Sequence, residues 1–431
     1  MKAQTPASKR ARVSRPERFQ VEMQLMALDQ MLPADHQARV VWQYVQGLDL
    51  EPLYRQIKVS DSQAGRSAID PAILVSLWLL ATLDGIGSAR ELDRRCGEQI
   101  PYMWICGGVG VNYHTLSDFR VEHGEFLESI LIDSVASLID RGLVSFQTLA
   151  QDGMRVRANA GSSSFRRKGT LEKLQQQAAA HLKRLDQENR DERVRIESER
   201  RRQAASRRAA EDRKRRVDEA LKQREKLAEQ REKRKKGDGE KTRVSTTDPD
   251  ARNMKMPNGG YNPAFNVQFV SDGDSRMIVS VDVTNQGTDS GLLAPAMEEI
   301  RSTYDRQASR VLVDSAYATA GDVTALEKAG TKVVSTVPRA DLMREAGKDP
   351  YSKQARDSVE YGEFRARMAT PEYQELYKQR PSIAEFPNAD CRNRQLQQFP
   401  VRGLVKARAI ALWHALAFNF RRMRNLGLMT T

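Results

Sequence analysis

The chain is poor in cysteine, in histidine clusters and in long apolar runs. Its 431 residues include three cysteines, Cys96, Cys106 and Cys391, and none has the paired CxxC spacing of a metal or redox site. These cysteines predict neither a disulfide framework nor a zinc site, and they fit a reducing cytoplasm. The histidines show no ligand spacing either; they are His36, His114, His123, His181 and His414.

The longest apolar run, AILVSLWLLATL, is about a dozen residues, shorter than the roughly 20 that cross a bilayer. The first residues, MKAQTPASKRARVSRPERF, carry charge but no apolar segment, so we expect no secretory signal. These absences predict a soluble, cytoplasmic protein with no membrane partner.

Basic residues, in contrast, are abundant and unevenly placed. The formal charge of the chain is +13. Between Arg166 and Arg243, 28 Lys or Arg residues stand against 16 Asp or Glu, a local charge of +12, and residues 1–20 add +5 from six basic residues and one acidic residue. The remainder therefore sums to −4 (13 − 12 − 5). A near-neutral body with basic appendages favours a polyanion such as DNA as the partner.

We expect residues 1–20 to form a disordered basic arm and residues 21–144 to form a helical, DNA-binding domain. One helix of this domain should begin at Ser88, with Glu91 completing the cap three residues later. Another should be capped at Thr115 or Ser117. Short helices joined by Gly turns are compatible with helix-turn-helix packing.

The spacing of apolar residues changes from a helical to a strand period after this domain. Residues 145–164, around SFQTLAQDGMRVRANA, predict a strand that ends at Asp152, and residues 165–243 predict one or two long charged helices without a core of their own. The thin apolar stripe of this insertion suits a hairpin or coiled-coil arm, and a solvated helix that only spaces two parts is the alternative.

Residues 244–428 alternate strands and helices, which predicts a partly parallel mixed sheet with helices on its faces. After a loop over residues 236–260, the expected elements are two strands with a turn at 272–275, a helix capped by Asp289 or Ser290, a strand at RVLVDSAY, a helix ending at Gly330, and a strand at TKVVSTVPR. The stretch 340–376 shows no clear pattern. An apolar C-terminal helix should bury His414.

Asp152 and Asp314 each follow a predicted strand, at the edge where open α/β sheets place their sites. Two carboxylates there suit Mg²⁺ or Mn²⁺. Capping of the following turn is the alternative role for each aspartate.

The order of these elements resembles that of DDE-type bacterial insertion-sequence transposases, which have a helical N-terminal domain before a ribonuclease-H-like α/β catalytic domain. The stretches that carry the resemblance run in family order from about residue 25 to 425; they are LPADHQARVVWQYVQGLDLEPLY, HTLSDFR, DGMRVRANA, TDPDAR, YNPAFNVQFV, DVTNQGTDS, VLVDSAY, YKQRPSIAE and FPVRGLVKARA…ALAFNFRRM.

The resemblance implies three catalytic, metal-binding acids: Asp152, Asp314 and Glu385. It also implies that Tyr377 and Arg380, from the Tyr…Arg…Glu motif, and Arg392 contact phosphates. Two positions depart from the family pattern. Arg392 stands where the family usually has lysine, and Ala316 replaces a glycine after the second aspartate.

The implied reaction is two-metal phosphoryl transfer, in which water nicks the transposon end and the freed 3′-hydroxyl then attacks target DNA. The implied partner is double-stranded DNA, bound by a homodimer or larger assembly in the bacterial nucleoid. End-specific reading is expected from Thr115, Ser117 and Arg120 at a helix start, where a capped structural helix is the alternative. Asp289 has two candidate roles, at the site or as a helix cap. The alternatives to a transposase are a non-catalytic DNA-binding protein and a nuclease without strand transfer.

Overall fold

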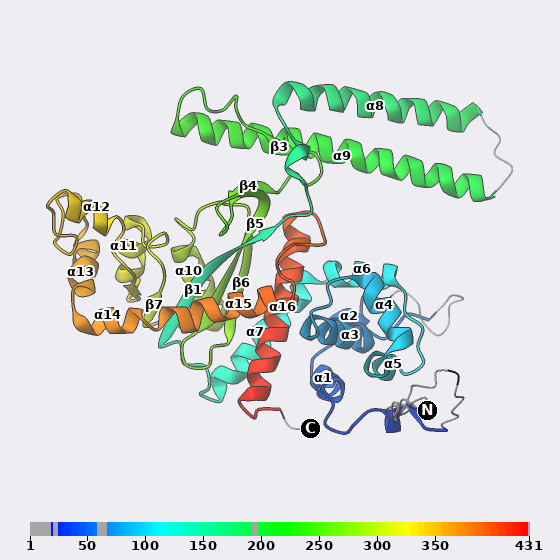
Figure 1. Cartoon of the computed structure of the whole chain (residues 1–431), viewed down its shortest axis with the longest axis horizontal. Coiled ribbons are helices and arrows are strands. Elements are labelled where there is room, and N and C mark those ends of the chain that lie inside the picture. The colour runs from blue at the N-terminus through cyan, green and yellow to red at the C-terminus, as the bar shows by residue number, and fades with distance from the viewer. Residues whose placement is uncertain (1–18, 20–24, 58–66, 192–196, 430–431) are drawn as a thin grey trace, which may run out of the picture.

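The structure is a computed structural model that describes residue 19 and residues 25–57, 67–191 and 197–429 (Figure 1). The predicted basic arm at residues 1–20 therefore lies outside the described residues, apart from Phe19. The described chain forms a helical region, a sheet flanked by helices, and a long helical hairpin that stands away from both.

The N-terminal region is helical, as predicted. After a short 3₁₀ turn at Leu28–Met31 it contains α1 (Gln37–Gln46), α2 (Glu51–Tyr54), α3 (Pro71–Leu83), α4 (Ala89–Glu98), α5 (Ile100–Cys106), α6 (Tyr113–Glu122) and α7 (Gly124–Asp140). Every residue of α3 is buried, which explains why its sequence is apolar all round. In the described part of the chain no helix is long and apolar enough to cross a membrane.

The two predicted caps in this region have different outcomes. Ser88 does cap α4, because its hydroxyl accepts a hydrogen bond from the Glu91 N–H at 3.4 Å. The predicted cap at Thr115 or Ser117 is wrong. Asn112 caps α6 instead, with its Oδ1 accepting from the Thr115 N–H at 3.0 Å, so both predicted residues lie inside the helix.

The sheet is mixed and follows the order β4-β5-β1-β7-β8, with β6 paired to β5. Strand β1 runs antiparallel to β5 and parallel to β7, and β7 is parallel to β8. This confirms the predicted ribonuclease-H-like α/β class. The strands are β1 (Thr148–Arg157), β4 (Arg252–Lys255), β5 (Tyr261–Asp272), β6 (Ile278–Thr284), β7 (Arg310–Leu312) and β8 (Lys332–Val334).

The predicted loop over residues 236–260 is wrong in part, because it contains two short strands. Strand β4 pairs with the start of β5. Strand β3 (Val244–Ser245) pairs with β2 (Phe165–Arg166) in a separate two-stranded ribbon. Pairing with distant segments, rather than local propensity, makes these residues extended.

Seven helices accompany the sheet in the described part of residues 290–429: α10 (Leu293–Tyr304), α11 (Ala320–Ala329), α12 (Ala340–Glu345), α13 (Val359–Met368), α14 (Pro371–Tyr377), α15 (Phe386–Asn393) and α16 (Leu404–Asn425). Helix α11 ends at Gly330 in the left-handed conformation, as predicted. The predicted cap of α10 by Asp289 or Ser290 is wrong, since α10 begins at Leu293 and its cap residue Leu292 makes no side-chain bond.

Helices α12, α13 and α14 occupy the stretch that showed no clear pattern in the sequence. A buried ion pair between Arg365 Nε and Asp357 Oδ2, at 2.8 Å, holds α13 in place. Arg365 also donates to the Pro350 carbonyl at 2.7 Å. The residues that make these contacts are not three or four positions apart in the sequence. The periodic spacing of apolar residues therefore does not reveal them.

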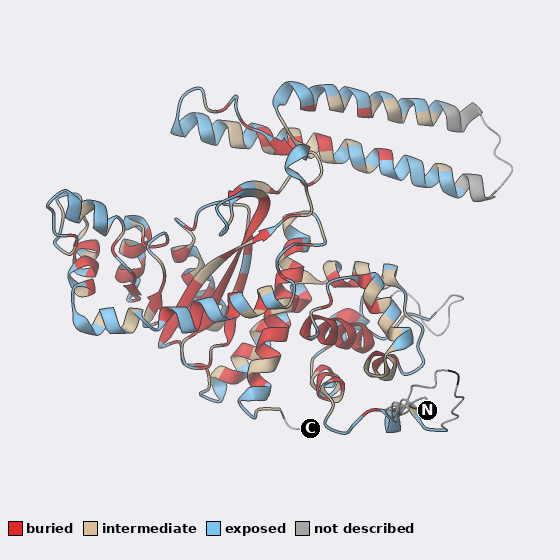
Figure 2. Ribbon diagram, in the orientation of Figure 1, coloured by how far each residue is buried: buried red, intermediate tan, exposed pale blue. Residues whose placement is uncertain are grey.

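Helix α16 joins the helical region to the sheet. It packs against α3, α6 and α7 on one side and against β6 on the other, within one continuous apolar core (Figure 2). The Trp413 indole donates to the Arg120 carbonyl at 3.1 Å, and Asn419 exchanges two hydrogen bonds of 2.8 Å with the Ile278 backbone. The helical region and the sheet are therefore held as one packed body.

Helices α8 (Lys168–Asp191) and α9 (Glu197–Arg234) form an antiparallel hairpin above this body (Figure 1). We call residues 168–234 the arm. A small separate core of Leu171, Ala220 and Val244 anchors its base, and most of its remaining described surface is exposed (Figure 2). Of the two forms considered from the sequence, the arm takes the hairpin form.

The largely buried His414 on α16 predicts a loss of stability in acid. Burial, together with the cations Arg394 and Arg120, lowers its pKa from 6.5 to about 4, and Asp390 opposes this only in part. Between these pH values the unfolded chain binds the proton and the folded chain does not. The free energy of unfolding should therefore fall by about 1.4 kcal/mol per pH unit from this residue, or ~3 kcal/mol between pH 6.5 and 4.

Urea denaturation of wild type and His414→Gln across this pH range measures the effect. The difference in unfolding free energy between the two should shrink as the pH falls. His181→Gln, on the arm, is the matched control and should follow wild type. A constant difference between wild type and His414→Gln would show that the folded protein binds the proton as readily as the unfolded chain.

Candidate active site

The sheet register brings Asp152 and Asp314 together. Strands β1 and β7 are parallel, and Ala150 pairs with Leu312, so each aspartate lies two residues beyond the same pair and on the same face. The prediction that β1 ends at Asp152 is wrong, because β1 continues to Arg157 through its antiparallel pairing with β5. Asp314 does follow its strand, two residues after the end of β7.

The Asp152 carboxylate is mostly buried and receives two side-chain hydrogen bonds. Arg380 Nη2 lies 3.0 Å from its Oδ1, and Asn388 Nδ2 donates to its Oδ2 at 2.8 Å. Burial raises the pKa of Asp152 to about 6; the Arg380 charge and the Asn388 bond lower it, and nearby Asp314 raises it. This carboxylate is thus ionised at neutral pH and is already paired with a cation.

Arg380 bridges Asp152 and Glu385. Its other nitrogen, Nη1, lies 2.9 Å from Glu385 Oε1, and its side chain is only 11 % exposed, against 53 % for Glu385. Burial lowers the pKa of Arg380, but Asp152, Tyr377, Asp314 and Glu385 together outweigh burial and raise it. Two of the three predicted acids therefore pair with one guanidinium, and the charge of the third, Asp314, helps to raise the pKa of Arg380.

A single π-helical turn, wider than an α-helical turn, positions Arg380. Residues Pro381–Glu385 form a π-helical turn between α14 and α15, with Arg380 just before it and Glu385 at its end. The turn places Arg380 and Glu385 where both can reach the face that bears Asp152. Such single π turns are frequent at functional sites.

Asp314 and Ala316 form a tight turn after β7. Asp314 Oδ1 accepts from the Ala316 N–H at 2.7 Å, so the turn-capping role considered from the sequence is present. Ala316 does not have a positive φ. The backbone therefore does not require the glycine that the family usually has at this position.

Behind the site, Asp289 is the centre of a buried polar network. Its carboxylate pairs with Arg155 Nη2 at 2.9 Å and accepts from Asn266 Nδ2 at 2.7 Å and from Gln268 Nε2 at 3.0 Å. Gln268 Oε1 in turn accepts from the Tyr317 hydroxyl at 2.5 Å. Asp289 is thus neither a helix cap nor a member of the acid cluster; it ties the turn after β7 to β5 and β1.

The predicted phosphate contacts fall into two groups. Tyr377, at the end of α14, lies near Arg380, and Arg392 in the last turn of α15 makes no ion pair within the described residues. Thr115 and Ser117 lie in the first half of α6 and are partly exposed. Arg120 does not fit the prediction that it reads DNA from a helix start.

Arg120 is 6 % exposed and lies in the last turn of α6. Its guanidinium covers the Trp78 ring, with the carbon 4.5 Å from the ring centroid, and donates to the Gly87 carbonyl. These contacts hold α6 against α3, so Arg120 serves the packing of the helical region and does not face solvent.

Asn388 and the hydrogen-bond network around Asp289 are not predicted from the sequence. Asn388 lies in α15, three residues after the cap residue Glu385. Residues three apart share a helix face, so this spacing could have indicated that Asn388 lies near the acids. The network joins β1, β5 and the segment before α10. No spacing in the sequence connects these three elements.

Comparison with protein-family models gives two matches. Residues 26–122 match the model described as "Transposase domain (DUF772)", and residues 237–420 match the model described as "Transposase DDE domain". The chain belongs to the DDE-type insertion-sequence transposases. No curated protein and no solved structure matches it.

The second match contains Asp314 and Glu385 but not Asp152, and the arm lies entirely between the two matched regions. The first match covers most of the helical region, and the second covers every strand of the sheet except β1. Helix α7, strand β1 with Asp152, and the arm lie outside both matches. The arm is inserted in the chain between β1 and the remaining strands of the sheet.

Gly153, next to Asp152, leaves the space that the Asp289 network fills. A methyl group at this position would lie 2.5 Å from Gln268 Nε2 and 2.7 Å from Asp289 Oδ1. We expect Gly153→Ala to lower the free energy of unfolding by about 2 kcal/mol, because strand β1 and the network cannot both keep their places. Urea denaturation measures the loss.

Gly161→Ala is the matched control. Gly161 has φ of −89°, and a methyl group there would meet only Ser163 Oγ, at 3.6 Å. Its unfolding free energy should stay within about 0.5 kcal/mol of wild type. Equal changes in the free energy of unfolding for Gly153→Ala and Gly161→Ala would show that the Asp289 network does not require glycine at position 153.

Proposed function

We propose that this transposase nicks the ends of an insertion sequence and joins them to target DNA, with water and then the freed 3′-hydroxyl as the attacking groups. The observation that carries the proposal is that Arg380 pairs with both Asp152 and Glu385, while the strand register places Asp314 beside Asp152. Attack on a phosphodiester adds charge to an anionic centre. Such a reaction needs positioned positive charge.

The residue types at the site fit a hard divalent cation such as Mg²⁺ or Mn²⁺. Carboxylates and amide oxygens are the ligands that these ions prefer, and Asn388 Oδ1 is buried beside Asp152 with no donor. In the described part of the chain no three acidic, histidine or cysteine side chains are already arranged to hold a metal. The salt bridges of Arg380 separate Asp152 from Glu385.

Asp152, Asp314 and Glu385 would hold the ions. When bound, two such ions activate the attacking oxygen and stabilise the leaving oxygen. The protein contributes the geometry around them. The parallel register fixes Asp152 beside Asp314, Asn388 orients the Asp152 carboxylate, and the Asp289 network keeps the turn bearing Asp314 against β5.

Arg380, Tyr377 and Arg392 supply donors for phosphates near the cut. Arg380 already lies among the acids, and its Nε is buried without an acceptor. The helical region, residues 21–144, would read the element ends through partly exposed α6 side chains such as Thr115 and Ser117. Joining two ends requires at least two catalytic chains, so we propose a homodimer or larger assembly on nucleoid DNA.

Removing any of the three acids should abolish the chemistry while leaving DNA binding nearly intact. Asp152→Ala, Asp314→Ala and Glu385→Ala should each lower the nicking rate on the order of 10³-fold or more, since acids that act as a unit fail together. The assay uses Mg²⁺ or Mn²⁺ and DNA that bears the inverted repeats flanking the gene. Gel shifts report binding separately.

Glu375→Ala is the control, since Glu375 is an exposed acid on α14 whose one ion pair among the described residues is with Lys378, at 2.6 Å. It should keep the wild-type nicking rate. Wild-type rates in all three acid variants would refute the assignment. Tight, salt-sensitive binding by the wild type without cleavage in any divalent metal would instead support a non-catalytic DNA-binding protein.

A further inference from the structure

The face of α9 that points away from α8 carries a regular row of basic residues. Arg201, Arg208, Arg215 and Lys222 follow one another at seven-residue intervals, and all four are exposed. Residues seven apart lie on nearly the same face of a helix. The row spans 21 residues, or roughly 32 Å along the axis. We refer to these four residues as the basic row.

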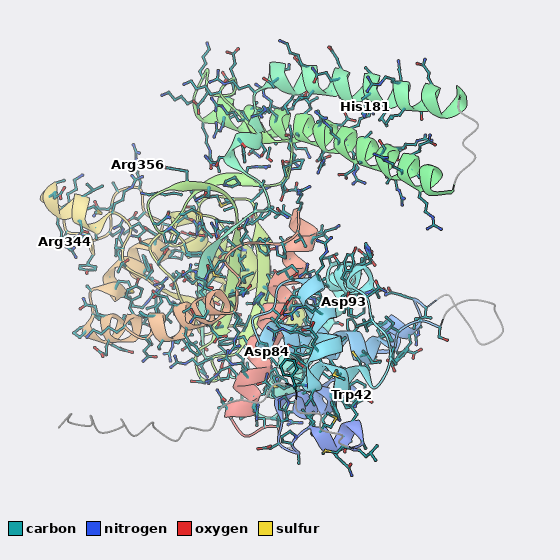
Figure 3. All side chains as sticks on the ribbon, turned by 45° about the vertical axis from the view of Figure 1, so that its right-hand side comes forward. Trp42, Asp84, Asp93, His181, Arg344 and Arg356 are labelled. Atoms are coloured by element: carbon teal, nitrogen blue, oxygen red, sulfur yellow. The ribbon has the colours of Figure 1, made fainter. Side chains whose placement is uncertain are left out.

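The surroundings of the row are strongly positive. From residue 201 to 216 the chain has eight Lys or Arg and two Asp or Glu, a net +6. Asp212 pairs with Arg215, which is exposed, and with Arg216, which is partly buried; water and salt weaken the first of these pairs. Arg208 and Lys222 make no salt bridge within the described residues. Many side chains of the arm stand out from its two helices (Figure 3).

The row points toward the side of the molecule on which the helical region lies. Its member Arg215, with Asp212 and Glu219 of the same α9 face, lines a cavity of about 490 Å³ that Ser117 and Val121 of α6 also line. In Figure 1, α9 lies between α8 and the body. Ser117, one of the α6 side chains proposed to read DNA, and Arg215 of the basic row therefore border the same cavity.

We infer that the arm is a second DNA-binding surface, which contacts the phosphates of a duplex held by the helical region. This inference rests on the proposed function. DNA presents phosphates at short, regular intervals, and exposed Lys and Arg side chains neutralise them without regard to sequence. The arm lies between the two family matches, so neither match accounts for it.

A second copy of the chain is a poorer occupant of this surface. Acidic residues do recur on α9 at the same spacing, as Glu211, Asp218, Glu225 and Glu232. Three of them already have partners in the chain, since Glu211 pairs with Arg207, Asp218 pairs with Lys214, and Glu232 accepts from the Gly237 and Gly239 N–H groups. Two basic rows facing each other would repel. The apolar residues of the arm pack inside the hairpin, and its described part exposes no large apolar side chain. The arm thus offers charge but no apolar area for a stable protein interface.

The salt dependence of DNA binding tests the inference. The full chain and the double variant Arg208→Gln/Lys222→Gln are titrated onto a fluorescein-labelled 30-base-pair duplex at several salt concentrations. Each lost phosphate contact should reduce the slope of log K against log[salt] by about 0.9, so the double variant should lose ~1.8. Both residues are exposed, so folding should be unaffected.

Lys173→Gln/Lys183→Gln, on exposed positions of α8, is the matched control with the same change of charge. It should keep the wild-type slope. The inference is overturned if the double variant keeps the slope, if both variants lose it equally, or if sedimentation shows that the double variant changes self-association instead of DNA binding.

Asp152→Ala keeps this test separate from the proposed function. It should lose nicking with the wild-type slope unchanged. Suppose that Arg208→Gln/Lys222→Gln loses the expected ~1.8 of the slope of log K against log[salt], but the wild type does not nick DNA. This result would uphold the arm as a DNA-binding surface and refute the catalytic proposal. Normal nicking by the wild type, together with an unchanged salt slope in Arg208→Gln/Lys222→Gln, would uphold the catalytic proposal and overturn the inference about the arm.

Discussion

One guanidinium, that of Arg380, sets the geometry of the candidate site. It is largely buried, and such a charge is stable only when it is paired. Asp152 and Glu385 provide the pairing at 3.0 and 2.9 Å, and they come from a central strand and a π-helical turn more than 200 residues apart. Because the cation pairs with both carboxylates, it holds together two acids that lie far apart in the sequence.

The rest of the fold supports this arrangement through rigid contacts. Parallel pairing of β1 with β7 fixes Asp314 beside Asp152, and the buried Asp289 network prevents the turn after β7 from moving away from β5. Helix α16 extends the same rigidity to the helical region, because its residues belong to the core of both parts. The helical region is thereby held at a defined position relative to the acids.

Charge and packing are divided between different parts of the molecule. The body carries the apolar core and a near-neutral charge, whereas the described arm has a core of a few residues at its base and an otherwise charged surface. A surface of this kind gains little from burial and much from counterion release. This division explains how an addition of about seventy residues fits between β1 and the remaining strands without disturbing the sheet.

The sequence alone determined the fold class, the helical nature of residues 21–144, the Ser88 and Gly330 helix ends and the three acids to examine. Each of these depends on a local period, a cap or an ordered motif, which neighbouring residues set by themselves. Only the tertiary structure decided that Asp152 lies within its strand, that Arg120 is buried under α3, that Asp289 holds a network and that Arg380 joins two acids. Pairing register, burial and ion pairs depend on partners distant in the chain, and the local spacing of residues does not encode which partners meet.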